Sequence, residues 1–156
     1  MPATIQTGPD RRQQTYQLIK KLQHERDALW TLYCDFATLK PFAASEPVKK
    51  GLMRFSQMLI DYISLGHFGV YERLLEGKER RGNIQAIAVK LYPELEMTTE
   101  IAVAFNDKYD ATDKIDRFNE LERDLSILGE NLAKRIDLED QFCNLMVNSD
   151  RRLQMR

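Results

Sequence analysis

The chain has 156 residues and is almost neutral, with 23 basic and 24 acidic side chains and a net charge of -1. A chain of this length buries about 68–70% of its unfolded surface in one core, so it needs no disulfide or metal to be stable. The charge balance excludes a protein-wide basic surface for nucleic acid. Neither a membrane span of roughly 20 apolar residues nor a secretory signal is present, so we expect a cytoplasmic protein without direct nucleic-acid or membrane contacts.

Two helices are predicted in the first half of the chain. Residues 1–10 contain two Pro and one Gly and are expected to form a flexible leader. The first helix is expected over residues 11–40, because apolar residues recur there at helical spacing and Pro41 disfavours helix at the residue before it. The second helix is expected over residues 48–77, directly after the helix-start pair Glu46-Pro47.

Two further helices are predicted in the second half. The third spans residues 84–110 and contains Pro93. Proline removes a backbone donor and clashes with the preceding turn, so we expect a kink or a break there. The fourth spans residues 114–148 and carries apolar residues along one face, and a polar tail, residues 149–156, follows it. No segment shows the alternation of a strand.

Four amphipathic helices with short connections predict an all-α protein. Short loops make successive helices antiparallel neighbours, so the favoured architecture is an antiparallel up-down-up-down four-helix bundle. The third helix would be kinked or broken near Pro93, and residues 11–148 would form a single domain. An extended coiled coil is the weaker alternative, because the apolar spacing drifts between three and four residues without sustained heptads.

The second predicted helix has two apolar faces, although packing into a core needs only one. At about 100° per residue, Leu59 and Ile63 fall on the stripe that is expected to face the core. Asp61 points the opposite way, and the residues around it mix bulky apolar groups with polar and charged ones: Arg54, Gln57, Met58, Ser64, Leu65, Phe68, Glu72 and Leu75. This mixture is typical of a protein-binding surface.

The sequence offers few ligands for a metal or cofactor. A di-iron bundle would need Glu-x-x-His pairs, and neither of the only two histidines, His24 and His67, completes one. Cys34 and Cys143 are isolated in apolar helical segments, so we expect reduced cysteines with a packing role. No phosphate-binding loop or nucleophile elbow is present either. We therefore predict no cofactor, no metal and no catalytic residues.

Two carboxylates occupy predicted core positions. Glu25 lies in the apolar stripe of the first helix and Glu139 in that of the last. A buried carboxylate needs a hydrogen-bond or charge partner. The candidate partners are Tyr62, His67, Tyr71 and Arg26. A catalytic acid/base pair is one interpretation, and a structural polar network that fixes the helix register is the one we favour.

Several segments of the chain carry an unusual combination of residues. Residues 59–73 read Leu-Ile-Asp-Tyr-Ile-Ser-Leu-Gly-His-Phe-Gly-Val-Tyr-Glu-Arg. Five further segments agree in order and spacing: Leu22-Gln-His-Glu-Arg26, Leu39-Lys-Pro41, Leu91-Tyr-Pro-Glu-Leu95, Leu128-Gly-Glu130 and Arg135-Ile-Asp-Leu-Glu-Asp140. Together they closely resemble the Rsd/AlgQ family of anti-sigma factors, and the resemblance extends from about Tyr16 to Val147.

The resemblance implies a helical protein that binds the primary sigma factor of RNA polymerase, mainly its region four. Binding would withhold sigma from core polymerase and from the −35 promoter element. Region four is a basic helix-turn-helix that contacts DNA, so an acidic and apolar surface could compete with DNA for it. The family's contact helix, carried over residue by residue, implies that the partner-binding residues are Asp61, Ser64, Leu65, Phe68 and Glu72, with Asp61 as the charged anchor.

Two other functions stay open at this point. One is a helical adaptor of the same shape that binds a different protein, and the other is a carboxylate-based metal protein that uses Glu25 and Glu139. The exposed face that carries Leu65 and Phe68 must also be tolerated when no partner is bound. A weak symmetric homodimer could shield it.

Overall fold

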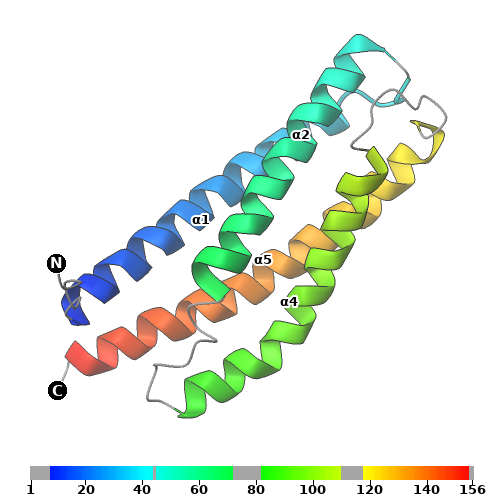
Figure 1. Cartoon of the computed structure of the whole chain (residues 1–156). Coiled ribbons are helices and arrows are strands. Elements are labelled where there is room, and N and C mark those ends of the chain that lie inside the picture. The colour runs from blue at the N-terminus through cyan, green and yellow to red at the C-terminus, as the bar shows by residue number, and fades with distance from the viewer. Residues whose placement is uncertain (1–7, 44, 72–81, 110–117, 155–156) are drawn as a thin grey trace, which may run out of the picture.

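The computed structural model describes residues 8–43, 45–71, 82–109 and 118–154. Within these ranges the chain is helical and contains no strand. Four α-helices account for most of it, and a π-helix follows the second (Figure 1): α1 (Gly8–Ala37), α2 (Glu46–Ser64), η1 (the π-helix, Leu65–Tyr71), α4 (Gly82–Tyr109) and α5 (Phe118–Gln154). The prediction of an all-α protein is confirmed.

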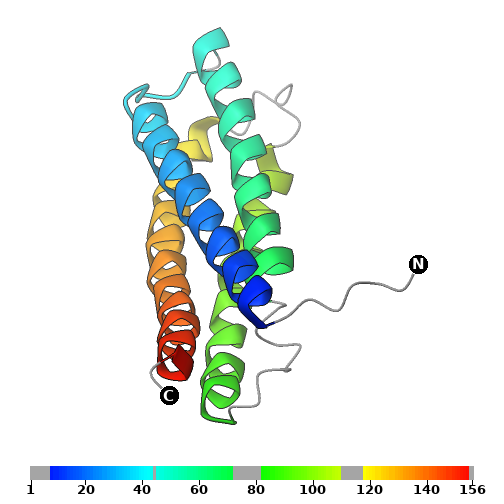
Figure 2. The same ribbon diagram turned by 90° about the vertical axis from the view of Figure 1, so that its left-hand side faces the viewer.

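The four α-helices pack side by side as a bundle. α1 contacts α2, α2 contacts α4, α4 contacts α5, and α5 contacts α1. The colours in Figure 1 show each helix running opposite to the one before it, so the start of α1 and the end of α5 lie at the same end of the bundle. Figure 2 shows α1 and α5 side by side, which closes the ring of helices around one core.

Helical spacing explains the core. Along α1, Leu22, Leu29 and Phe36 recur every seven residues, which is about two turns, and all three are buried. α5 contributes a longer buried row: Phe118, Leu121, Leu125, Leu128, Leu132, Leu138, Phe142 and Cys143. Burying one large apolar side chain stabilises the fold by about 1.5–3 kcal/mol. Because each helix keeps a polar face, none of the described helices has the length and apolarity to span a membrane.

The first connection lies close to its predicted position. α1 ends at Ala37, before the predicted end at Lys40, because the N–H groups of residues 38–40 bond to carbonyls three residues earlier and tighten the last turn. α2 begins at Glu46, with Pro47 in its first turn. The missing N–H of proline costs no hydrogen bond there.

The α-helical geometry that was predicted through residue 77 ends at Ser64. The backbone continues as η1, in which each hydrogen bond spans five residues and the chain turns less per residue. Gly66 and Gly69 lie in η1, and each lowers helix propensity by about 1 kcal/mol relative to Ala. A β carbon on Gly69 would make an ordinary contact with Cδ2 of Leu18 on α1 at 3.7 Å and a tighter one with Cδ1 of Leu65 at 3.3 Å. Residues 72–77 lie outside the described ranges.

The last two helices differ from prediction at specific points. α4 passes through Pro93 as one helix, so the break, one of the two predicted outcomes, is absent. α5 extends to Gln154, so the segment predicted as a tail after Asn148 is helical as far as that residue. The predicted start of this helix, near Lys114, lies outside the described residues.

The two cysteines have different environments. Both are free thiols, but only Cys143 is buried, whereas Cys34 is exposed on α1. The packing role predicted for both is therefore found for Cys143 alone. Cys34 follows an apolar stretch of sequence, yet it lies on the side of α1 that faces away from the core.

Candidate partner-binding surface

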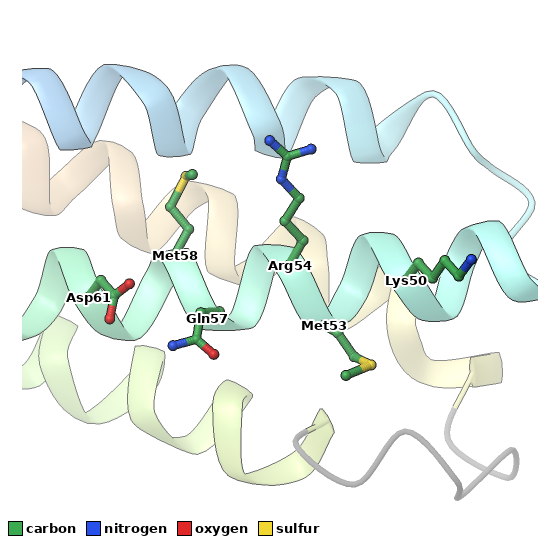
Figure 3. Close-up of a pocket in the computed structure, with 6 residues that line it drawn as sticks. All are labelled: Lys50, Met53, Arg54, Gln57, Met58 and Asp61. Carbon is green, nitrogen blue, oxygen red and sulfur yellow. The ribbon is translucent and has the colours of Figure 1, made fainter.

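A shallow, open groove of about 470 Å³ lies on the outward side of α2, which we call the ridge. Its lining comes from this helix alone (Figure 3): Lys50, Met53, Arg54, Gln57, Met58 and Asp61. Met58 points toward the α1 side of the ridge and Met53 toward the α4 side. Lys50 and Asp61 lie at the two ends. Two methionines, Arg54 and Gln57 thus lie between a positive end and a negative end.

The predicted partner-binding residues divide into three groups. Asp61, Ser64 and Phe68 are exposed, and Phe68 is 69% exposed, which leaves most of an aromatic ring in contact with water. Leu65 is half-buried and packs against the core. Glu72 lies outside the described residues. The structure therefore supports a free surface at Asp61, Ser64 and Phe68.

The helical wheel placed Leu65 in the Asp61 face, but the core covers part of its side chain. The residues before it are α-helical and Leu65 itself has α-helical dihedral angles, so its direction follows the wheel and its partial burial comes from packing. After Leu65 the backbone is π-helical and turns less per residue, so the wheel misplaces the residues that follow. Short π-helical segments occur frequently at functional sites.

His67 packs against aromatic rings. Its ring meets Phe68 edge-on, with the two centroids 4.8 Å apart, and its centroid lies 6.4 Å from that of Tyr92 on α4. An edge-to-face pair contributes about 0.5–1.5 kcal/mol beyond its buried area. The side chain of His67 is half-buried, and among the described residues no hydrogen bond joins it to a carboxylate. The His67 ring thus contacts the Phe68 ring, most of which stays exposed to water.

A polar cluster is buried in the core at Glu139. Tyr62 of α2 donates its hydroxyl to Oε1 of Glu139 on α5. The same oxygen lies 3.2 Å from Nε of Arg135, one turn earlier on α5. All three side chains are fully buried, and the guanidinium of Arg135 lies 5.5 Å from the centre of the Tyr62 ring. The predicted partner Tyr62 is therefore in place, and a second one is present.

Arg135 is the member of this cluster that the sequence prediction missed. It donates to Oγ1 of Thr98 at 3.1 Å and to Oγ1 of Thr99 at 2.7 Å. Asn131 on the same helix donates to the backbone carbonyl of Thr98 at 2.9 Å. The cluster therefore joins α2, α4 and α5. A signal was available, because Arg135 and Glu139 stand at the i,i+4 spacing of a helical ion pair.

The other residues predicted for this network are placed elsewhere. Glu25 is half-buried on α1, and within the described ranges no hydrogen bond joins it or His67 to Glu139. The side chain of Tyr71 lies outside the described residues. α1 instead reaches α5 through Arg26, which donates to Oδ1 of Asp140 at 2.9 Å.

Burial controls the protonation of the cluster. It raises the pKa of Glu139 well above its usual range, and the positive charge of Arg26 offsets only part of this effect. Burial also raises the pKa of the Cys143 thiol to about 12. A metal ion at Glu139 would meet the repulsion of the Arg135 guanidinium. In the described part of the chain, no group of three or more side chains is arranged to hold a metal ion.

The sequence of this helical bundle matches one known protein family. The family model described as "Regulator of RNA polymerase sigma(70) subunit, Rsd/AlgQ" matches residues 1–147. The chain belongs to the Rsd/AlgQ family. The matched region contains the α2 groove, η1 and the buried polar cluster, so each of these features lies in the part of the chain that is similar to other Rsd/AlgQ proteins.

Individual Rsd/AlgQ relatives are similar over most of their length. A regulator of sigma D from Yersinia enterocolitica is 35% identical over 130 residues, which cover 81% of this chain and 78% of the relative. The protein of the same name from Enterobacter sp. is 37% identical over 139 residues, covering 85% and 82%. That from Escherichia coli O1:K1 is 34% identical over 140 residues, covering 86% of both chains. No solved structure matches this chain.

Proposed function

We propose that this Rsd/AlgQ protein is an anti-sigma factor that acts without catalysis. It binds the primary sigma factor of RNA polymerase, chiefly its region four, and withholds sigma from core polymerase and from the −35 promoter element. Membership of a family described as regulators of the sigma(70) subunit supports this proposal. So do the names of its relatives, which are regulators of sigma D.

The observation that carries the proposal is the exposed acidic and aromatic surface where α2 passes into η1. Asp61 offers a carboxylate, and Phe68 offers an aromatic ring that is 69% exposed. Region four is a basic helix-turn-helix whose cationic side chains contact DNA phosphates. A carboxylate competes with a phosphate for the same guanidinium groups, while an exposed ring covers apolar surface beside them. Sigma held in this way has no free surface for the promoter.

The buried cluster has a positioning role in this mechanism. Tyr62, the neighbour of Asp61 on α2, is fully buried and donates to Glu139. Because both residues belong to one rigid helix, the anchored Tyr62 fixes the direction in which Asp61 points. The surface is therefore preorganised, and binding does not have to order it first.

Calorimetric titration of the full chain with an isolated region-four domain of sigma tests the proposal. We expect Asp61→Ala to weaken binding by about 2–5 kcal/mol, because it leaves a buried arginine of sigma unpaired. Asp137→Ala removes a carboxylate from the exposed face of α5 and is the matched control. Its affinity should equal that of the wild type.

Two results would contradict the proposal at different levels. Full affinity in the variant that combines Asp61→Ala and Phe68→Ala would show that the binding surface lies elsewhere. A wild-type protein that neither binds region four nor displaces it from −35 promoter DNA would exclude the anti-sigma function itself.

A further inference from the structure

The residues that line the α2 groove are arranged symmetrically about a point between Phe55 and Ser56. Lys50 and Asp61 stand equally far from this point along the helix. The same holds for Met53 with Met58 and for Arg54 with Gln57. The two members of each pair lie on opposite sides of this point and at the same number of residues from it.

We propose that this ridge binds a second copy of the chain. Two α2 helices would pack antiparallel, related by a two-fold axis that passes the point between Phe55 and Ser56. Such an interface is isologous, so every contact occurs twice. Each groove residue of one copy would then lie at the level of its symmetric counterpart in the other copy.

Charge complementarity favours this occupant. In the antiparallel arrangement, Lys50 of each copy faces Asp61 of the other, which gives two ion pairs at the ends of the interface. Within one copy these residues are about 16 Å apart along the helix axis, so they cannot pair with each other. A second copy in this arrangement supplies a partner of opposite charge to both ends of the groove at once.

The two methionines also fit this arrangement. Met53 lies on the α4 side of the ridge and Met58 on the α1 side. The two-fold axis places the α1 sides of both copies on the same side of the interface. Met53 of one copy and Met58 of the other then lie at the same level along the helices but on opposite sides of the interface. The two side chains can interleave without collision, and the flexible methionine chain adapts to the space left between helices.

One contact opposes the association. Arg54 points toward the α1 side in each copy (Figure 3), so the two guanidinium groups lie on the same side of the axis and repel each other. The buried surface of a single helix ridge is also small, at the low end of specific interfaces. We therefore expect a weak dimer whose affinity increases when the charge of Arg54 is removed.

The dimer would cover Asp61, and this gives it a consequence for regulation. If Asp61 binds sigma, a second copy and sigma compete for the same carboxylate; this consequence rests on the proposed function, whereas the dimer itself does not. The surface also differs from the one expected from sequence, which centred on Leu65 and Phe68.

Sedimentation velocity over a concentration series from micromolar to millimolar tests the dimer. Lys50→Glu and Asp61→Lys each bring like charges face to face, and each should weaken the dimer by at least about tenfold, or 1.4 kcal/mol. A mixture of the two variants should associate again, because the substituted residues complement each other across the axis. Arg54→Gln should strengthen the dimer.

A wild-type protein that stays monomeric at millimolar concentration would overturn the inference, as would two single variants whose mixture does not associate. Region-four binding by Lys50→Glu separates the two proposals, because this substitution leaves Asp61 in place. Intact sigma binding without a wild-type dimer contradicts only the dimer. A charge-dependent dimer in a protein that does not bind sigma contradicts only the anti-sigma function.

Discussion

Nε of Arg135 lies 3.2 Å from Oε1 of Glu139, and both side chains are completely buried. A buried ion pair adds little net stability, but removal of one member leaves the other uncompensated. The two residues respond differently to this loss. Burial raises the pKa of Glu139 well above its usual range, so the carboxyl group can take up a proton, whereas a guanidinium cannot lose one.

Glu139→Leu should therefore destabilise the fold more than Arg135→Met. We expect the loss of Glu139 to cost about 3–5 kcal/mol, because it removes the carboxylate that lies 3.2 Å from the buried guanidinium. The smaller cost of Arg135→Met should grow with pH, since a group with a raised pKa loses its stabilising contribution as the pH rises through that pKa. Urea unfolding followed by circular dichroism measures both values.

The exposed neighbours on α5 provide the controls for this pair. Lys134→Met and Asp137→Leu make the same kinds of change on the solvent side and should alter stability by less than about 0.5 kcal/mol. Equal costs for Glu139→Leu and Arg135→Met at every pH would contradict the difference that we infer.

Asp124 makes a pH-dependent contribution where α4 meets α5. Burial raises its pKa, but hydrogen bonds from Lys108 at 2.6 Å and from Tyr109 at 2.5 Å outweigh this effect and leave the pKa lowered. Its stabilising contribution is thus present near neutral pH and is lost as the pH falls through the lowered pKa. Asp124→Asn should cost about 1 kcal/mol near neutral pH and much less in acid.

The exposed Asp107 on α4 is the matched control at neutral pH. Asp107→Asn should alter the unfolding free energy there by less than about 0.5 kcal/mol. A constant difference between Asp124→Asn and the wild type at all pH values would contradict the role of the lowered pKa.

The two thiols should react at very different rates. The thiolate is the reactive form, and a pKa of about 12 leaves almost no thiolate on the buried Cys143 at neutral pH. Ellman's reagent should therefore modify Cys34 alone in the native protein and both cysteines in denaturant. Rapid reaction of native Cys34→Ser would show that Cys143 is accessible.

Gly129 makes room for Tyr33 between α1 and α5. The Tyr33 hydroxyl donates to the backbone carbonyl of Leu125 at 2.8 Å, and a β carbon on Gly129 would collide with the same side chain, since its Cζ would lie only 2.8 Å away. Gly129→Ala should therefore destabilise the fold by about 1–3 kcal/mol, despite its better helix propensity. The thermal unfolding midpoint measures this loss.

A double-mutant cycle with Tyr33→Phe isolates this contact. Removing the hydroxyl group takes away the nearest colliding atom, so Gly129→Ala should cost less in the Tyr33→Phe background than in the wild type. Additive effects of the two substitutions would show that the cost arises elsewhere in the helix.

Much of the fold could be predicted, because helical spacing alone locates a core. The helical recurrence of apolar residues predicted a buried stripe along α1, and in the structure Leu22, Leu29 and Phe36 are buried whereas Leu18 and Leu32 are partly buried. Periodicity could not reveal η1, since a helical wheel assumes the angle that a π-helix changes. Periodicity also could not decide whether the helix breaks at Pro93 or continues through it, because packing by the neighbouring helices determines this.

The candidate site could be predicted in part for a similar reason. Glu139 was predicted as a buried carboxylate because it lies in an apolar stripe, and Tyr62 was one of its four candidate partners. Arg135 was not predicted as a member of the cluster, although it is fully buried, because a basic residue in a long helix is usually solvated. Long-range contacts such as those of Arg135 with Thr98 and Thr99 are set by the docking of helices.

The buried cluster takes its side chains from α2, α4 and α5, whereas α1 is attached by apolar contacts and by Arg26 and Tyr33 at its polar margin. Buried polar contacts thus join α2, α4 and α5 to one another, and α1 packs against these three helices. Native-state opening should begin with α1, whose amide protons would exchange fastest among the four helices. Such an opening would uncover the inner side of α2 and leave its outward ridge unchanged.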